Sequence, residues 1–134
     1  MERIQPAGVH DPKTYAQALR AGNLLFLSGQ VALDPHGEVV GRGDVAAQAD
    51  FIWKQIGVIL RAGGAGYRSI AKITTYVVNM ADRPVTMEVR KRYLGEHLVT
   101  STLVGISALA RPELLIEIEV IAVLDEPAPP PPSR

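Results

Sequence analysis

The sequence predicts an α+β fold in which two helices cover one face of a mixed β-sheet. Two observations carry this prediction. The segment 114–123, which reads LLIEIEVIAV, alternates with the two-residue period of a strand, and two other stretches place apolar residues at helical spacing. The expected order is strand, strand, helix, strand, helix, strand, strand. A chain of 134 residues is long enough for one such domain, which we expect to span residues 1–124.

The segment 114–123 is the most clearly marked strand. Successive side chains of a strand point to opposite sides, and one parity here is wholly apolar: Leu114, Ile116, Ile118, Val120 and Ala122. The other parity carries Glu117 and Glu119 between apolar residues. A solvent-facing side rarely holds so much apolar surface, and a core rarely holds two carboxylates. We therefore expect neighbouring subunits to bury this second face, with at least one Glu opening into a cleft.

The other strands are predicted from apolar runs bounded by turn residues, at residues 14–19, 24–28, 70–78 and 102–107. The segment 24–28 is apolar on both parities, so it also needs cover on both faces. Residues 1–13 are polar and interrupted by Pro and Gly, which indicates an irregular arm. The Pro-rich end, residues 125–134, is predicted to be a disordered tail.

Asp44 is placed to cap the first helix, whose run ends at Gly63-Gly64. Its apolar stripe comprises Val45, Ala49, Ile52, Ile56, Ile59 and Leu60. Trp53 lies off this stripe and is expected to be partly exposed. Asp82 is the expected cap of a second helix over residues 83–95, with Pro84 in its first turn. The inner stripe of this helix is predicted to contain Val85, Val89 and Tyr93.

Composition excludes several classes of function. The 14 basic residues balance 14 acidic ones, so nothing predicts capture of nucleic acid or of an anionic membrane. The chain has no Cys, and no stretch approaches the ~18 apolar residues of a membrane span. We therefore expect a cytoplasmic protein without nucleic-acid or membrane partners. His10, His36 and His97 lack metal-ligand spacing, so neither a metal nor another cofactor is predicted.

Several motifs together resemble the YjgF/Rid superfamily, which includes imine/enamine deaminases and carries an older endoribonuclease L-PSP label. They are TYAQAL, AGNLLFLSGQVALDPHGEVV, DVAAQ, ITTYVVNM, GEH and IEIEVIAV, and they span nearly the whole chain. The resemblance implies a chorismate-mutase-like fold. It also implies a homotrimer whose sheets form an inner barrel, with three small-molecule clefts at the subunit interfaces.

The resemblance also implies candidate site residues. The glutamate that positions water in the family's deaminases falls on Glu117, the cleft tyrosine on Tyr15, and the SGQ serine on Ser28, followed by Gly29. The family's carboxylate-binding arginine does not carry over. Its segment reads VTSTLVGIS here, so the position falls on Ser101 or its neighbour, with Thr102 also lining the site. Neutral hydroxyls cannot reproduce the paired charged hydrogen bonds of a guanidinium, which counts against the usual 2-imino acid substrates. Arg111 lies in an insertion near the cleft side.

Three functions follow as alternatives. In the first, the clefts bind a small planar metabolite and hydrolyse an imine or enamine bond, with Glu117 orienting water. In the second, the trimer binds or senses a metabolite without turnover, and Glu117 is an ion-paired or hydrogen-bonded interface residue. The third is RNA cleavage, which zero net charge and the absence of interleaved aromatic and basic residues disfavour.

Overall fold

The computed structural model describes residues 1–125, and these form one six-stranded sheet with two α-helices. The strands are β1 (Glu2–Ile4), β2 (Ala18–Ala21), β3 (Leu24–Gln30), β4 (Ile70–Val77), β5 (Thr100–Gly105) and β6 (Ile116–Val123). Their order across the sheet is β1-β2-β3-β6-β4-β5, with β4 and β5 parallel and every other pair antiparallel. Strand β6 is therefore central, between β3 and β4.

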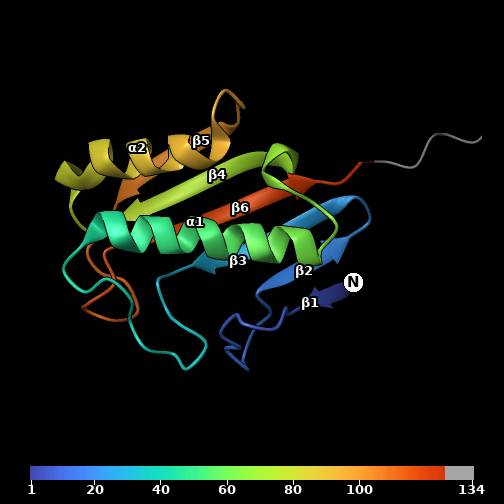
Figure 1. The fold of residues 1–134 in the computed structure, drawn as a ribbon, viewed down its shortest axis with the longest axis horizontal. Coiled ribbons are helices and arrows are strands. Elements are labelled where there is room, and N and C mark those ends of the chain that lie inside the picture. Colours follow the sequence, from blue (N-terminus) through green and yellow to red (C-terminus); the bar gives the residue numbers. More distant parts are fainter. Residues whose placement is uncertain (126–134) are drawn as a thin grey trace, which may run out of the picture.

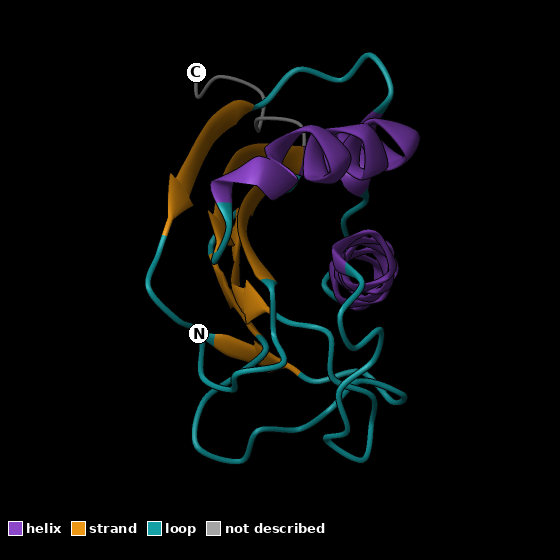
Figure 2. Ribbon diagram, turned by 90° about the vertical axis from the view of Figure 1, so that its left-hand side faces the viewer, coloured by secondary structure: helices purple, strands orange, loops and turns teal. Residues whose placement is uncertain are grey.

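Helices α1 (Val45–Ala62) and α2 (Arg83–Leu94) lie side by side on one face of the sheet (Figure 1). Single-turn 3-10 helices η1 (Tyr67–Ser69) and η2 (Met80–Asp82) precede β4 and α2. In the edge-on view both helices stand on the same side and the opposite face carries no helix (Figure 2). The predicted α+β fold with two helices on one face is confirmed. Among the described helices, none combines the length and the apolar character that a membrane span requires.

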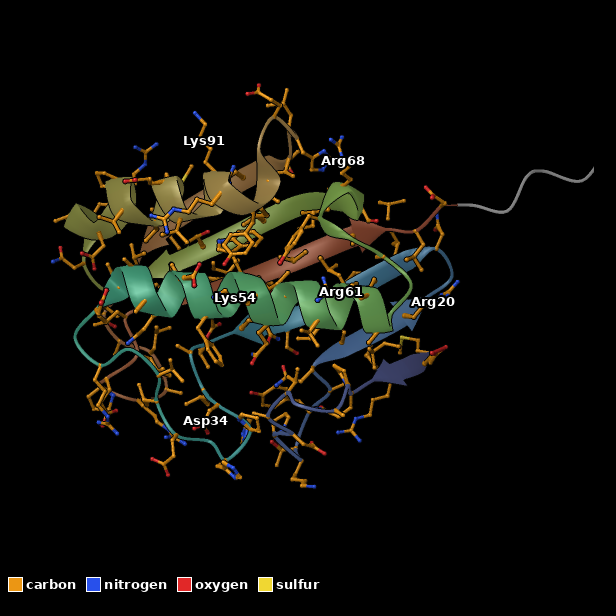
Figure 3. The ribbon with its side chains drawn as sticks, viewed as in Figure 1. Arg20, Asp34, Lys54, Arg61, Arg68 and Lys91 are labelled. Atoms are coloured by element: carbon orange, nitrogen blue, oxygen red, sulfur yellow. The ribbon has the colours of Figure 1, made fainter. Side chains whose placement is uncertain are left out.

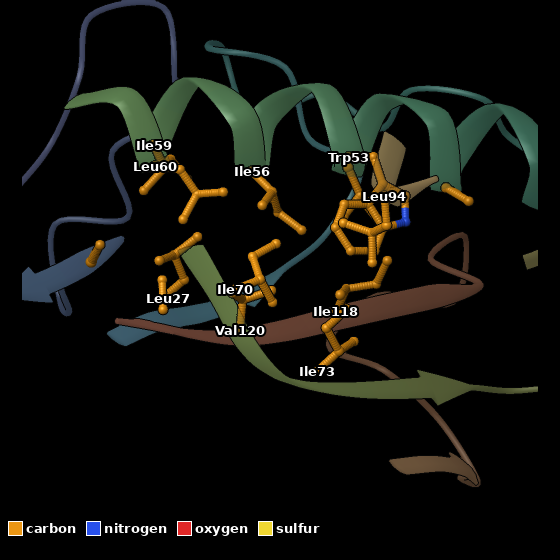
Figure 4. Close-up of a cluster of buried hydrophobic side chains, with 14 of the residues drawn as sticks. Leu27, Trp53, Ile56, Ile59, Leu60, Ile70, Ile73, Leu94, Ile118 and Val120 are labelled. Carbon is orange, nitrogen blue, oxygen red and sulfur yellow. The ribbon is translucent and has the colours of Figure 1, made fainter. Parts of the chain in front are cut away.

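The core fills the space between α1 and the sheet (Figure 4). The predicted inward parity of β6 is confirmed, because Ile116, Ile118 and Val120 are at most 2% exposed. Five residues of the α1 stripe are completely buried: Ala49, Ile52, Ile56, Ile59 and Leu60. Each large aliphatic side chain contributes about 1.5–3 kcal/mol when fully buried, so this layer holds the helices on the sheet.

The first predicted strand, residues 14–19, is wrong at its N-terminal end, since β2 begins only at Ala18. Before that point regular pairing ends: the Gln17 carbonyl still accepts from the Ser28 amide at 2.9 Å, while its side chain donates to the His10 carbonyl at 2.8 Å. The prediction that residues 1–13 are irregular is wrong for Glu2–Ile4, which form strand β1 and pair with β2. Strand β5 also begins at Thr100 and ends at Gly105, two residues earlier at each end than predicted.

The two helix caps behave differently. Asp44 Oδ1 accepts from the Ala47 amide at 3.0 Å, so the predicted cap of α1 is confirmed. Asp82 makes no side-chain cap bond, because η2 leads directly into α2 and leaves Asp82 in a helical conformation with φ −77°. The capping side chain belongs instead to Asn79, at the start of η2, which accepts from the Ala81 amide.

Trp53 is only 1% exposed, so the expected partial exposure is wrong. Its ring stacks on Tyr93 of α2 with centroids 6.2 Å apart, and the Tyr67 hydroxyl donates to the Trp53 carbonyl at 2.8 Å. The side of α1 beside the main stripe therefore packs against α2. Val85, predicted on the inner stripe of α2, is 38% exposed, whereas Val89 is fully buried.

The face without helices keeps exposed apolar side chains. Phe26 of β3 and Val123 of β6 are 39% and 41% exposed, and Phe26 pairs with the half-buried Ile121. We call this the open face. Of the predicted tail, only Asp125 lies among the described residues.

Candidate functional site

Glu117 projects from the centre of the open face toward strand β3. A Cβ atom built on Gly29 would lie 2.1 Å from Glu117 Oε2 and 2.6 Å from its Cδ. The carboxylate therefore occupies space that only glycine leaves free. Burial, followed by repulsion from Glu119, raises the pKa of Glu117 above its ordinary value of 4.5. A carboxylate of this kind exchanges protons closer to neutral pH than a solvated one.

A bulge in β3 brings Ser28 and Gly29 beside these carboxylates. Leu27 pairs with Val120 and Gln30 with Ile118, so the register shifts and two residues of β3 face the single residue Glu119. The Ser28 hydroxyl donates to the Ala16 carbonyl at 2.7 Å. Its hydrogen is therefore engaged, and only its lone pairs remain for a ligand.

Three almost fully buried amides hold the bulge from behind. Gln55 of α1 donates to Gln30 Oε1 at 2.7 Å, and Gln30 Nε2 donates to Gln17 Oε1 at 2.7 Å and to the Ser28 carbonyl at 3.0 Å. Gln17 donates in turn to the His10 carbonyl. This series of hydrogen bonds links α1, the bulge of β3 and the N-terminal arm. Because the buried amide groups in it all have partners, it holds the backbone next to Glu117 in one geometry.

A hollow of about 300 Å³ opens beside the bulge on the open face. It is lined by Tyr15, Ala16, Leu19, Phe26, Leu27, Ser28 and Glu119. Tyr15 is 53% exposed, and a much smaller cavity of about 10 Å³ connects it with Gly29. The fold thus brings together four predicted site residues, Tyr15, Ser28, Gly29 and Glu117. Their roles stay predictions.

Tyr76 is a residue of this site that sequence reasoning missed. It lies on β4 directly opposite Glu117, and its hydroxyl donates to Glu119 Oε1 at 3.2 Å. Burial, with the nearby Glu119 charge, raises the pKa of Tyr76. The sequence contains one signal for it, a single aromatic residue among the open-face positions of ITTYVV. That residue can be assigned to the site only when the β4–β6 register is known.

Ser101 and Thr102, the other two predicted residues, point to opposite faces. Thr102 pairs with Thr74, which pairs with Glu119, so Thr102 lies on the open face two strands from the carboxylate, roughly 10 Å away. Ser101 pairs with the fully buried Ile73 and so faces the helices. The structure therefore separates Ser101 from the Glu117 group within one chain.

Two arginines lie near these segments. Arg90 Nη1 donates to Ser101 Oγ at 2.7 Å, and burial lowers the pKa of Arg90. Arg111 is exposed, and its guanidinium lies beside the turn that contains Gly37. Neither lines the hollow. Within residues 1–125, no group of three or more His, Asp or Glu side chains is arranged to hold a metal ion.

Comparison with known proteins places this arrangement in a family. The model of the family described as Endoribonuclease L-PSP matches residues 8–124. This protein belongs to that family, within the YjgF/Rid superfamily. A RutC family protein of Pyrococcus horikoshii is 39% identical over 109 residues, covering 81% of this chain and 85% of the relative.

Two further relatives of this Rid-family chain show how its members are named. The 2-iminobutanoate/2-iminopropanoate deaminase of the mouse is 33% identical over 109 residues, covering 81% of this chain and 80% of the deaminase. The crystal structure of RidA from an Antarctic Psychrobacter species superposes with a TM-score of 0.85 at 28% identity, covering 92% of this chain and all of that one. The described fold is thus the fold of the Rid proteins.

Proposed function

We propose that this Rid-family chain hydrolyses the imine or enamine bond of a small planar metabolite, with Glu117 orienting the attacking water. The observation that carries the proposal is the placement of Glu117: a half-buried carboxylate with a raised pKa, packed on Gly29 beside a hollow lined by Tyr15 and Ser28. Some relatives are named imine deaminases, which supports the same reaction type.

The chemistry requires few groups. Glu117 accepts a proton from water as the water oxygen bonds to the imine carbon. The protonated carboxyl returns that proton to the nitrogen, which gives a carbinolamine. Glu117 then carries the hydroxyl proton of the carbinolamine to the nitrogen as the carbon–nitrogen bond breaks, which gives a carbonyl compound and ammonia. A carboxylate with a raised pKa suits both halves of this exchange. Tyr15 and Phe26 offer ring faces on which a planar ligand can stack.

The same proposal includes a homotrimer with the sites at subunit interfaces. The open face exposes Phe26 and Val123, and β6 carries carboxylates beside these apolar side chains. Exposed apolar surface of this kind is typical of an association face, and a closed ring of identical subunits would cover it. Thr102, which lies two strands away from Glu119, would then meet a neighbouring subunit or its ligand.

The test follows the disappearance of enzymatically generated imines and the release of ammonia. Wild-type protein should accelerate hydrolysis above the buffer rate, and Glu117→Gln should lose about 10²-fold or more, as expected when a general base is removed. Glu38→Gln, the same change at an exposed loop position, is the matched control and should be fully active. Full activity of the Glu117→Gln variant would eliminate Glu117 as the base.

A second candidate is a metabolite-binding trimer without turnover. One observation favours it: two hydroxyl groups beside the carboxylates are already engaged, Ser28 with the Ala16 carbonyl and Tyr76 with Glu119. Such a protein would retain a ligand through native mass spectrometry and release it unchanged. Conversion of the ligand on incubation would instead support the hydrolase.

A further inference from the structure

We infer that the substrate of this site is an imine that carries its positive charge as an iminium group and has no carboxylate. The inference rests on the function proposed above and names the class of substrate. It is drawn from the lining of the hollow and from the distribution of charge over the two faces of the sheet.

The hollow is lined by groups that attract cations. Two aromatic side chains, Tyr15 and Phe26, and one carboxylate, Glu119, border it, together with aliphatic residues. An aromatic face attracts a cation placed over it, and a carboxylate does so more strongly. No Lys or Arg belongs to the lining. A small organic cation with an apolar body fits these walls, and an anion finds no partner among their charged side chains.

The negative charge of the site is not neutralised within the chain. Glu117 and Glu119 are two positions apart on β6 and therefore share the open face. None of the ion pairs formed by the described residues includes either one. The only side-chain hydrogen bond recorded for the pair in residues 1–125 comes from the neutral Tyr76 hydroxyl to Glu119. Within one chain, an incoming carboxylate would thus meet the carboxylate of Glu119 and no basic side chain in the lining of the hollow.

The basic side chains around the site are engaged or lie apart from it. Arg90 binds Ser101 on the helix-covered face. Arg3 of β1 lies opposite Leu19 of the lining and so shares the open face, but its guanidinium is paired with Asp11 at 3.0 Å. Lys72 is on the open face of β4, where it pairs with Ile121, so β6 separates it from the hollow at that row. Because Lys72 is the open-face cation closest to Glu119 along β4, the test includes it.

The helices carry further cations away from the site. Lys54, Arg61 and Lys91 project from α1 and α2, on the opposite side of the sheet (Figure 3). Lys54 is also paired with Asp50 at 3.1 Å. The net charge of the chain is zero, but the charges are unevenly distributed. Many of the basic side chains lie on the helix layer, and two carboxylates lie at the centre of the open face.

An iminium substrate fits this arrangement and the reaction. The protonated group R₂C=NH₂⁺ reacts with water to give R₂C=O and NH₄⁺, so atoms and charge balance without another reactant. Glu117 takes one proton from water and returns it to nitrogen, while Glu119 stabilises the positive charge. Glu117 then takes the hydroxyl proton of the adduct as the carbon–nitrogen bond breaks and passes it to the departing ammonia, which leaves as NH₄⁺. A 2-imino acid adds a carboxylate, which would gain no compensating cation here.

The experiment compares two imines with the same side chain. One is the 2-imino acid formed from leucine by an amino acid oxidase, and the other is the imine formed from isopentylamine by an amine oxidase. We expect kcat/KM to favour the imine without the carboxylate by at least tenfold. Glu119→Gln should reduce this ratio to less than about threefold. Glu38→Gln, the matched surface control, and Lys72→Met should leave the ratio unchanged.

Binding of unreactive probes gives a second readout. NMR shifts at Tyr15 should report tighter binding of isopentylammonium than of 4-methylpentanoate, with the preference lost in Glu119→Gln. Equal or greater kcat/KM for the 2-imino acid would overturn the inference and leave the proposed hydrolase intact. If neither imine is hydrolysed, the proposed function fails, and the binding of the probes decides whether the site prefers cations. Tighter binding of the ammonium than of the carboxylate would support that preference. Equal binding, or no binding of the ammonium, would overturn it.

Discussion

Replacing Gly29 by Ala should displace the Glu117 carboxylate while leaving the fold almost unchanged. The new Cβ would lie 2.1 Å from Glu117 Oε2, whereas real Cβ contacts essentially never fall below 3.0 Å, so the carboxylate must retreat by about 1 Å. A misplacement of that size costs on the order of 10²-fold in rate when the displaced group acts in the reaction. Gly29 does not have positive φ, and the atoms it would meet belong to a flexible side chain. We therefore expect unfolding free energy to change by no more than about 1 kcal/mol.

The assays are imine hydrolysis, thermal unfolding and an NMR titration of the Glu117 carboxyl group. Displacement toward solvent should lower the pKa of Glu117 toward 4.5. Gly66→Ala is the matched control, because its Cβ would meet nothing within 4 Å and its φ is −148°. In a Glu117→Gln background, Gly29→Ala should cause no further loss of rate. An equal loss in both backgrounds would refute the idea that Gly29 acts through Glu117.

Three other perturbations test different parts of the structure. Because the folded-state pKa of Glu117 is raised, its ionised form opposes folding and wild-type stability falls as pH rises from about 4.5 through that pKa. Glu117→Gln should therefore raise the melting temperature at pH 7, with the gain shrinking below pH 4.5, and a loss of stability at pH 7 would contradict this sign. Trp53→Ala should cost about 3–5 kcal/mol in urea unfolding, because the ring is 1% exposed and stacked on α2, and a cost below 1 kcal/mol would exclude that packing. Phe26→Asp should lower the mass measured by sedimentation without unfolding the chain. Val85→Asp, a control at nearly the same exposure on α2, should leave the mass unchanged. Equal effects of the two changes would argue against association through the open face.

The sequence predicted best where a local pattern decides the structure. The alternation in 114–123 identified the buried parity of β6, and the spacing of Ile52, Ile56 and Ile59 identified the inner face of α1. Asp44 was predictable as a cap because its partner is only three residues away. These features depend on periods of 2 and 3.6 residues and on contacts within one turn.

Contacts between distant segments could not be predicted in the same way. The burial of Trp53 depends on Tyr93, forty residues later, and the pairing of β1 with β2 places Arg3 opposite Leu19 in a segment predicted to be irregular. The faces of Ser101 and Thr102 follow from the β4–β5 register, in which a shift of one residue exchanges the two sides. For that reason the resemblance could name Ser101 as a site position without revealing that its side chain meets Arg90.

The site shows the same division. The resemblance identifies Gly29 as a site residue next to Ser28. The reason that glycine is required there follows only from the position of the Glu117 carboxylate, which a Cβ atom would meet. Tyr76 required the pairing of β4 with β6 before it could be recognised as a neighbour of both carboxylates. Sequence motifs therefore located the strands that carry the site, and the sheet register determined which side chains meet.

Closure of the open face by identical subunits is the central proposal, since it would place Glu117 at a sheltered interface. Sedimentation equilibrium over a range of micromolar concentrations measures this directly. Closure in a ring of three subunits predicts a particle with three times the chain mass of 14.4 kDa. A particle with the mass of one chain throughout that range would contradict it.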